Sequence, residues 1–284
     1  MSKYDSLDNL IYKIFKFTNG YDRMAIKKII NETPVNNANK LKLNISKIST
    51  IILKYCQRQP LKRDEKRQDF ITEKILNFLN GMRPEIINEN LSIADIGGGN
   101  GDVISLMNIL LSGRCDNFVC VETATDWVES YSHNHDNILY KFWDNNVIDI
   151  PSNSCDVVMC MVSLHHMDEN TVLNTMKEMK RILKKNGLVL IKEHDSDNLN
   201  VHRLIDWEHH LYHILDCAYE NKSVDVNEYL NKIVHNFHSK HFWGRIFQEN
   251  DFKFVTRTNR FLDGDYVEND PKNPTKLYWD VYSK

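Results

Sequence analysis

The chain has 284 residues, 42% of them hydrophobic, which is enough for one sizeable core or for one domain with an appendage. Its net charge of −3 argues against a chain-wide electrostatic attraction to nucleic acid. No apolar run is long enough to span a bilayer, the first residues are polar, and the six cysteines form no C-x-x-C pair, so we expect a cytoplasmic protein with reduced thiols, no signal peptide and no membrane association.

Residues 1–84 are predicted to be helical, because apolar side chains recur at helical spacing in residues 7–15, 26–30, 43–55 and 70–79. Residues 1–80 hold sixteen Lys or Arg and eight Asp or Glu, an excess of eight positive charges, whereas the rest of the chain carries −11. The basic residues of segment 54–67 are a weak hint of a nucleic-acid partner, and a solvated helical surface is the preferred explanation of them. We interpret residues 1–84 as a helical cap on a domain formed by residues 85–284.

Residues 93–102 read I-A-D-I-G-G-G-N-G-D, an apolar strand followed by a glycine-rich turn and an apolar helix over 103–111. Glycine permits the positive φ angles of such a turn, and a helix that starts behind it presents free N–H groups to a ligand. The dinucleotide fingerprint G-x-G-x-x-G is absent because its last position is Asp102, and the chain has no Walker G-K-[ST] sequence.

The pattern D-x-G-x-G-x-G resembles motif I of the class I S-adenosylmethionine (SAM) methyltransferases. This resemblance implies that Asp95 lies near the amino-acid end of SAM, and that the turn makes room for the cofactor through Gly97, Gly98, Gly99, Asn100 and Gly101. A second apolar strand, 118–121, ends in Glu122, twenty-one residues after Gly101. By the same resemblance, Glu122 accepts the two ribose hydroxyls with its two oxygens, and Thr123 lies beside it.

The third predicted strand is followed by Asp144 and Asn145, which the resemblance places at the adenine; a carboxylate can accept from its exocyclic amine. Met161 and Val162, at the end of the strand over 157–162, complete the predicted cofactor set. The L-H-H sequence that follows borders the transferred methyl group in the family. His165 or His166 is therefore a candidate to take a proton from the acceptor, the alternative being that one packs and the other contacts the cofactor.

An amphipathic helix is predicted over 168–183, with Lys184–Gly187 as its C-terminal stop, before a strand over 188–191. This strand leads into Glu193 and His194, at the sheet edge where ligands of open α/β sheets bind. Both are further catalytic candidates, unless the cluster is only a solvated strand exit. Helices are expected over 199–250, and residues 252–261 and 277–282 alternate as a final antiparallel hairpin.

The spacing of histidines in the last third of the chain bears on metal binding. His209 and His213 are four residues apart, and His235, His238 and His241 recur every third residue. The chain has no H-E-x-x-H sequence, and we predict no metal site.

The predicted architecture is an α/β, seven-stranded, doubly wound sheet with an antiparallel last strand, an N-terminal helical extension and a helical insertion near 199–250. The predicted function is SAM-dependent methyl transfer to an unidentified acceptor. Neither a D/N-P-P-Y sequence nor the aspartate of a Lys-Asp-Lys-Glu set stands at the end of the fourth strand, which leaves small molecules, lipids, proteins and other RNA positions. Two alternatives remain: a catalytically silent subunit that serves a partner, and an RNA-binding or RNA-modifying protein that uses residues 54–67. No oligomeric state is predicted.

Overall fold

The computed structural model describes residues 6–34, 36–58, 66–86, 90–123, 128–129, 131–258 and 273–284. It divides the chain into two compact units. The helical unit comprises residues 1–64, 196–235 and 268–276, and the sheet unit comprises residues 65–195, 236–267 and 277–284. Each unit is therefore assembled from segments that are distant in the sequence.

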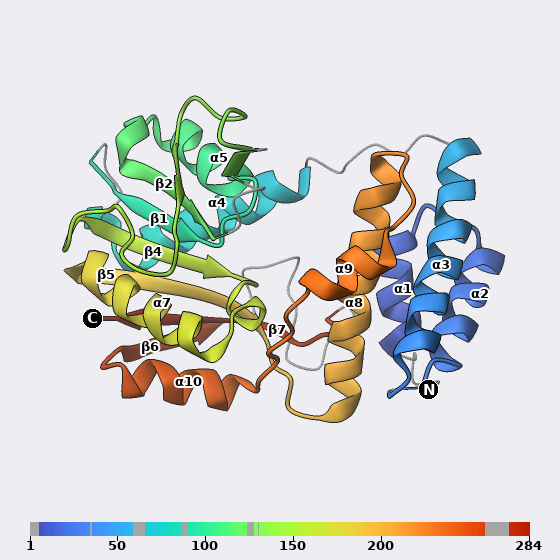
Figure 1. Ribbon diagram of the computed structural model, residues 1–284. Helices are drawn as coiled ribbons and strands as arrows, with labels where there is room; N and C mark the ends of the chain where they lie inside the picture. The colour runs from blue at the N-terminus through green and yellow to red at the C-terminus, as the bar shows by residue number, and fades with distance from the viewer. Residues whose placement is uncertain are drawn as a thin grey trace. The chain divides into compact units, whose positions relative to one another are not determined.

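The sheet unit contains a seven-stranded sheet in the order β3-β2-β1-β4-β5-β7-β6 (Figure 1). Strands β1 to β5 are parallel, whereas β7 runs antiparallel to both β5 and β6. This topology confirms the predicted fold class. The strands are β1 (Ile93–Ile96), β2 (Phe118–Glu122), β3 (Leu139–Phe142), β4 (Cys155–Met161), β5 (Leu183–His194), β6 (Lys253–Thr258) and β7 (Leu277–Ser283).

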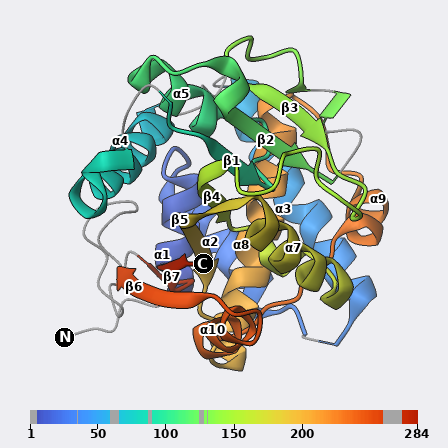
Figure 2. The same ribbon diagram turned by 90° about the vertical axis from the view of Figure 1, so that its left-hand side faces the viewer.

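Helices cover both faces of the sheet (Figure 2). Side chains alternate between the faces along a strand: Val157 and Met159 belong to the core under α4 (Lys66–Met82) and α5 (Asp102–Leu111). Val158 and Cys160 belong to the core under α7 (Glu169–Ile182) and α10 (Lys240–Glu249). A strand buried on both faces needs a continuous apolar run, which explains the composition of β4. Two short 3₁₀ helices, η1 (Pro84–Ile86) and η2 (Cys115–Asn117), complete the connections.

The helical unit packs three N-terminal helices against two later ones: α1 (Ser6–Phe15), α2 (Gly20–Asn31), α3 (Ala38–Arg58), α8 (Leu199–Tyr219) and α9 (Val226–Lys232). Their apolar stripes form one core, which includes Leu10 and Ile48 from the N-terminal part and Leu211 from α8. An ion pair between Lys13 and Glu208, 3.0 Å long, also joins α1 to α8. Within the units, α4 covers the sheet, and α8 and α9 share a core with α1–α3. The division into a cap over 1–84 and a domain over 85–284 stays a prediction.

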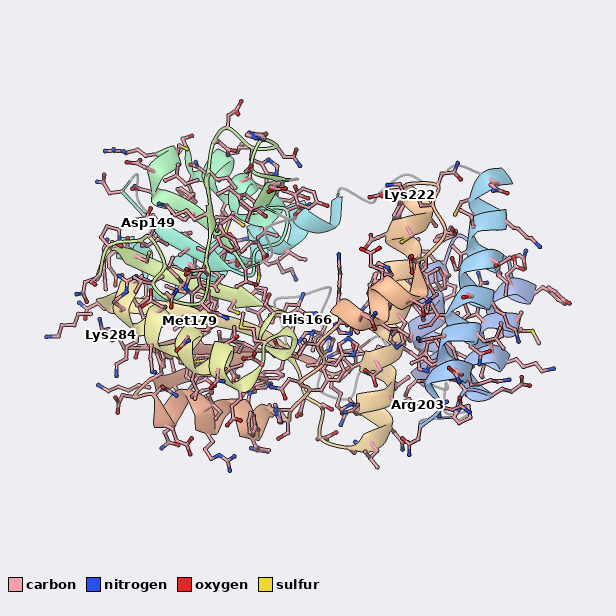
Figure 3. The ribbon with its side chains drawn as sticks, viewed as in Figure 1. Asp149, His166, Met179, Arg203, Lys222 and Lys284 are labelled. Carbon is pink, nitrogen blue, oxygen red and sulfur yellow. The ribbon has the colours of Figure 1, made fainter. Side chains whose placement is uncertain are left out.

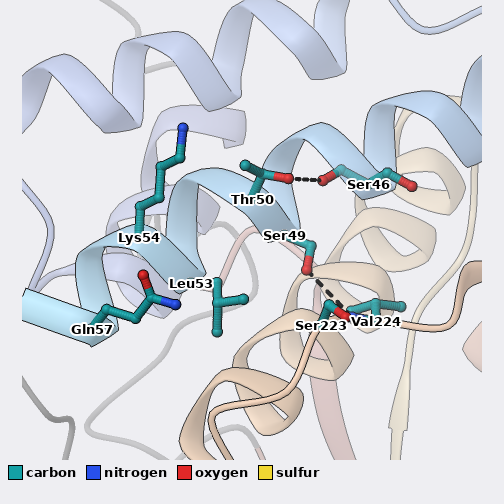
Figure 4. A pocket seen from close by; sticks show the side chains of 8 residues that line it. All are labelled: Ser46, Ser49, Thr50, Leu53, Lys54, Gln57, Ser223 and Val224. Atoms are coloured by element: carbon teal, nitrogen blue, oxygen red, sulfur yellow. Dashed lines mark hydrogen bonds between the residues drawn. The ribbon is translucent and has the colours of Figure 1, made fainter.

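A pocket of about 370 Å³ opens in the helical unit between α3 and the loop before α9 (Figure 4). Four of the eight residues that line it carry a hydroxyl group, and the Ser49 hydroxyl accepts a hydrogen bond from the Val224 amide at 3.4 Å. Lys54 lines the pocket and belongs to the basic segment 54–67, whose other basic side chains lie outside the described residues. The structure therefore adds no contact that bears on a nucleic-acid partner.

The predicted helix stop at Lys184–Gly187 is wrong, because these residues belong to β5. Helix α7 ends at Ile182, and Leu183 already has the extended φ and ψ angles of a strand. Leu183 pairs with Cys155, and a register shift follows before Val157 pairs with Leu188. Lys184–Gly187 thus span the register shift between two residues of β5 that pair with β4, and they do not end the helix.

No helix among the described residues is long and apolar enough to cross a membrane. All six cysteines are free thiols. Burial raises the pKa of the Cys155 thiol to about 11 and raises those of Cys120 and Cys160 as well, so these thiols stay protonated at neutral pH.

Replacing Asp280 by alanine is expected to reduce the free energy of unfolding by about 1–3 kcal/mol, because a buried carboxylate and its hydrogen bonds are lost while the partly exposed Arg257 can be solvated. Asp280 on β7 is 1% exposed and receives two hydrogen bonds from Arg257 on β6, of 2.6 and 2.7 Å, and one of 3.0 Å from the Tyr282 hydroxyl. Urea unfolding measures the change. The exposed pair Arg245–Glu249 supplies the control, since Glu249→Ala should cost less than about 0.5 kcal/mol.

Candidate active site

The carboxyl ends of β1, β2, β4 and β5 converge on a glycine turn, residues 97–101, between β1 and α5. Gly97, Gly99 and Gly101 have φ angles of 70°, 62° and 78°, a region that side chains with a Cβ rarely occupy. A Cβ atom on Gly97 would lie 2.4 Å from the Ser163 hydroxyl. The glycines are thus required both by the backbone angles and by the close approach of the segment that follows β4.

Asp95, in β1 beneath this turn, is fully buried. Among the described residues, no hydrogen-bond donor reaches either of its carboxyl oxygens. Burial, and then the nearby Glu122 carboxylate, raise the pKa of Asp95 to about 7. A buried carboxyl with two vacant acceptor oxygens beside a glycine turn fits a ligand that brings N–H donors and positive charge.

The contribution of Asp95 to the free energy of unfolding should fall as the pH rises from about 3.8 to about 7. Its pKa in the folded chain lies above its unfolded value, so within this window the folded chain holds a proton that the unfolded chain has lost, and raising the pH favours unfolding. Asp95→Asn removes this titration and should make the fall shallower. Urea unfolding of both proteins at pH 5 and pH 7.5 measures the difference, and equal slopes would contradict the assignment.

Glu122, the last residue of β2, reaches back to the glycine turn. One carboxylate oxygen accepts from the Gly99 amide at 2.6 Å and the other accepts from the Thr123 amide at 3.2 Å. Burial raises the pKa of Glu122. Each carboxylate oxygen accepts more than one hydrogen bond, so both keep lone pairs for hydroxyl donors. The side-chain amide of Asn100, within the turn, donates a hydrogen bond to the Asp102 carboxylate at 2.6 Å.

The residues after β3 divide into one exposed and two packed side chains. Asp144 is exposed, and hydrogen bonds from the Asn146 side chain and amide lower its pKa, so it is ionised at neutral pH. Asn145 has a φ of 68° and donates to the Thr171 hydroxyl of α7 at 2.8 Å. Trp143 is 1% exposed and lies in the core between the sheet and α7 and α10. Only Asp144 of the three thus presents its polar atoms to solvent.

The backbone beyond β4 is strained. Met161 ends the strand, and the next residue, Val162, has a φ of 55°, which is rare for a β-branched residue. The Val162 amide donates to the Lys192 carbonyl of β5 at 2.7 Å, and the Ser163 hydroxyl donates to the Gly97 carbonyl at 3.0 Å. Such strain persists where surrounding contacts enforce it and concentrates at functional sites.

Glu193 of β5 holds the segment that follows this strained residue. Its side chain is buried and accepts from the Leu164 amide at 2.9 Å, from the His194 amide at 3.2 Å and from Nδ1 of His165 at 2.7 Å. Asn236 also holds this segment: its backbone amide donates to the His165 carbonyl at 2.7 Å. Glu193 therefore fixes both the turn and the orientation of the His165 ring.

The two histidines of the 3₁₀ helix η3 (Leu164–His166) differ in exposure. His165 is 1% exposed, whereas His166 is exposed beyond the carboxyl end of β4 (Figure 3). Their ring centroids are 4.2 Å apart, and that of the buried His194 is 5.4 Å from His165. The structure thus gathers the four predicted catalytic candidates, His165, His166, Glu193 and His194, at one place.

Sequence reasoning missed Ser163 and Asn236 as parts of this site. Ser163 lies beside the L-H-H sequence, and its contact with the Gly97 carbonyl has no local signature. Asn236 is distant along the chain, and nothing in its neighbourhood indicates a contact with η3. Both contacts arise only when the sheet and its crossover connections bring these segments together.

Comparison with known proteins finds a matching family and solved structures that share the fold. The family described as "Methyltransferase domain" matches residues 63–257. No curated protein matches the chain.

Three solved structures share the fold, each with a TM-score of 0.50. A SAM-dependent methyltransferase from Aquifex aeolicus is 13% identical, over 82% of this chain and 97% of its own. A structure of a methyltransferase in complex with the Trm112 methyltransferase activator of Haloferax volcanii is 12% identical, over 78% and 98%. A geranyl diphosphate methyltransferase in complex with SAM is 8% identical, over 88% and 92%.

Proposed function

We propose that this chain, which belongs to the class I SAM-dependent methyltransferases, transfers the methyl group of SAM to an acceptor that carries an O–H or N–H group. The observation that carries this proposal is the cluster of Glu193, His165 and His166 at the end of β4, beside the glycine turn. Such an acceptor must lose a proton, and imidazole accepts protons near neutral pH.

The residues of the sheet unit divide between cofactor and acceptor. SAM is the cofactor, and when bound it supplies a methyl group on a positively charged sulfur, a good electrophile. The residues that would hold it are those around the glycine turn and the strand ends: Asp95, Gly97, Gly98, Gly99, Asn100, Gly101, Glu122, Thr123, Asp144, Asn145, Met161 and Val162. The unpartnered carboxyl of Asp95 and the reach of Glu122 to Gly99 support this assignment.

On the acceptor side, His166 is the candidate base because its ring is exposed, and His165 is its positioning neighbour. Since Nδ1 of His165 donates to the Glu193 carboxylate, the lone pair of its neutral imidazole is at Nε2. With SAM bound, the acceptor would lose its proton to His166 as its oxygen or nitrogen takes up the methyl group that the cofactor supplies. The chain's main task is to hold the acceptor in line with the methyl group.

Glu122→Ala is expected to weaken the binding of SAM more than His166→Ala does, because Glu122 lies on the cofactor side and His166 on the acceptor side. Isothermal titration with SAM and with S-adenosylhomocysteine should give Kd values in the micromolar range for the native chain and for His166→Ala. If His166→Ala weakened SAM binding more than Glu122→Ala does, the assignment of Glu122 to the cofactor and of His166 to the acceptor would be wrong.

The same titration separates the alternatives. Binding of both ligands, together with methyl transfer from tritiated SAM to pools of small molecules, lipids, proteins or RNA, would identify an enzyme and its acceptor class. Binding without transfer supports a silent subunit. No binding leaves a degenerate scaffold or a pocket that only a partner completes; one structural neighbour is a complex with an activator. An RNA affinity that falls steeply with salt would favour the role of the basic segment 54–67 in nucleic-acid binding.

A further inference from the structure

A row of polar side chains follows one face of α8 in the helical unit. His202, Asp206, His209 and His213 stand at positions i, i+4, i+7 and i+11, which share a helix face. His235, from the segment after α9, packs on this row: its Nδ1 is 2.7 Å from an Asp206 oxygen, and its ring centroid is 5.0 Å from that of His209. The fold therefore pairs His209 with His235, and not with His213 as the spacing in sequence suggested.

Hydrogen bonds determine which ring nitrogen carries the proton in this pair. Nδ1 of His209 is 2.7 Å from the Ile205 carbonyl oxygen, which can only accept, so this nitrogen is the donor. Nδ1 of His235 likewise faces the Asp206 carboxylate. In both neutral imidazoles the lone pair is therefore at Nε2.

This arrangement is typical of metal-ligating histidines. Such a histidine usually donates its second ring N–H to a carboxylate or a backbone carbonyl, which fixes the ring and raises its basicity. His235 has the carboxylate and His209 has the carbonyl. The side chain of His235 is 13% exposed, and its Nε2 atom, the proposed ligand, is itself buried.

The other nearby histidines have different environments. His210 is buried, its Nδ1 is 3.0 Å from the Tyr229 hydroxyl, and burial lowers its pKa to about 4. The His213 ring stacks on Tyr229 at 3.9 Å between centroids. His202 is 3.9 Å from Asp206, on the same carboxylate as His235 but through its other oxygen.

We propose that Nε2 of His209 and Nε2 of His235 form a binding site for a divalent transition-metal ion of the Zn²⁺ type, with Asp206 as the residue that positions His235. Imidazole suits Zn²⁺, Cu²⁺ and Ni²⁺. Two protein ligands leave further coordination positions to water or to a ligand atom from outside. This proposal differs from the sequence-based prediction of no metal site. It does not rest on the proposed methyl transfer.

Titration of the full chain with Zn²⁺ tests the proposal. The native chain should bind one equivalent with a Kd in the micromolar range, and His209→Ala and His235→Ala should each weaken that binding by roughly 100-fold. Asp206→Asn should weaken it by about 10- to 100-fold, as loss of a residue that orients a ligand does. The matched control is His213→Ala, which removes a histidine from the same helix face and should leave the Kd unchanged.

Two results would overturn the proposal: no Zn²⁺ binding by the native chain, or binding that keeps its Kd when both His209 and His235 are replaced. Because the chain has twelve histidines and six cysteines, other residues could bind the added metal, and the double variant detects this. Should a variant fail to fold, histidine ¹⁵N NMR of the native chain replaces it. Zn²⁺ must then shift the Nε2 signals of His209 and His235, and unchanged signals would refute the site.

Discussion

Gly99→Arg is expected to lower the affinity for SAM by roughly 100-fold or more, which corresponds to at least about 2.7 kcal/mol, and to leave the chain folded. Gly99 has a φ of 62°, where a residue with a Cβ loses about 1–2 kcal/mol. Its amide also donates to Glu122, the predicted ribose ligand. An arginine here would place a cation beside the carboxyls of Asp95 and Glu122, where it competes with a positively charged ligand.

Gly81→Arg is the matched control, because a Cβ on Gly81 meets no atom within 4 Å and this residue lies near the end of α4. It introduces the same side chain and charge into the same unit and should leave the Kd for SAM unchanged. Isothermal titration measures binding, and circular dichroism confirms the fold of each variant. If a folded Gly99→Arg protein bound SAM with the native affinity, the assignment of residues 97–101 to the cofactor would be wrong.

Glu193→Ala is expected to reduce the free energy of unfolding by about 3–5 kcal/mol, since it leaves three buried donors without their acceptor. These donors are the amides of Leu164 and His194 and the Nδ1 of His165. Urea unfolding measures the loss, with Glu249→Ala as the control for removal of an exposed carboxylate. A loss below about 1 kcal/mol would show that Glu193 does not hold the turn.

Glu193→Gln separates the structural role from the chemical one. The glutamine oxygen can still accept from the Leu164 amide, so the loss of stability should be smaller. Its NH₂ group then faces His165, which favours the tautomer with the proton at Nε2 instead of Nδ1. With an acceptor identified by the tritium assay, kcat should fall while the Kd for SAM is kept. Unchanged kcat, or an equal loss of SAM affinity, would contradict a positioning role on the acceptor side.

Local patterns were enough to predict the sheet and the family. Apolar runs over 93–96, 118–121 and 157–161 predict buried parallel strands, and the D-x-G-x-G-x-G sequence predicts the turn with positive φ angles that the structure contains. These features depend on residues close together in the chain, so the sequence displays them directly. The roles of individual residues in binding SAM stay predictions.

Contacts between distant segments could not be predicted in this way. The sequence indicated both Glu193 and the L-H-H sequence as catalytic candidates. Only the pairing of β4 with β5 brings the carboxylate of Glu193 into contact with His165, twenty-eight residues away. The same holds for Lys184–Gly187, which resemble a helix stop but lie within β5, between Leu183 and Leu188, which both pair with β4.

The sequence by itself determined the strand–turn–helix at Asp95, the order of strands and helices along the chain, and the residues that can carry the chemistry. Only the tertiary structure decided that α4 packs on the sheet, that α8 and α9 share a core with α1–α3, and that His235 meets His209 over Asp206. The physical reason is that backbone angles and amphipathic periodicity depend on neighbouring residues, whereas these contacts depend on how apolar faces from separate segments are buried together.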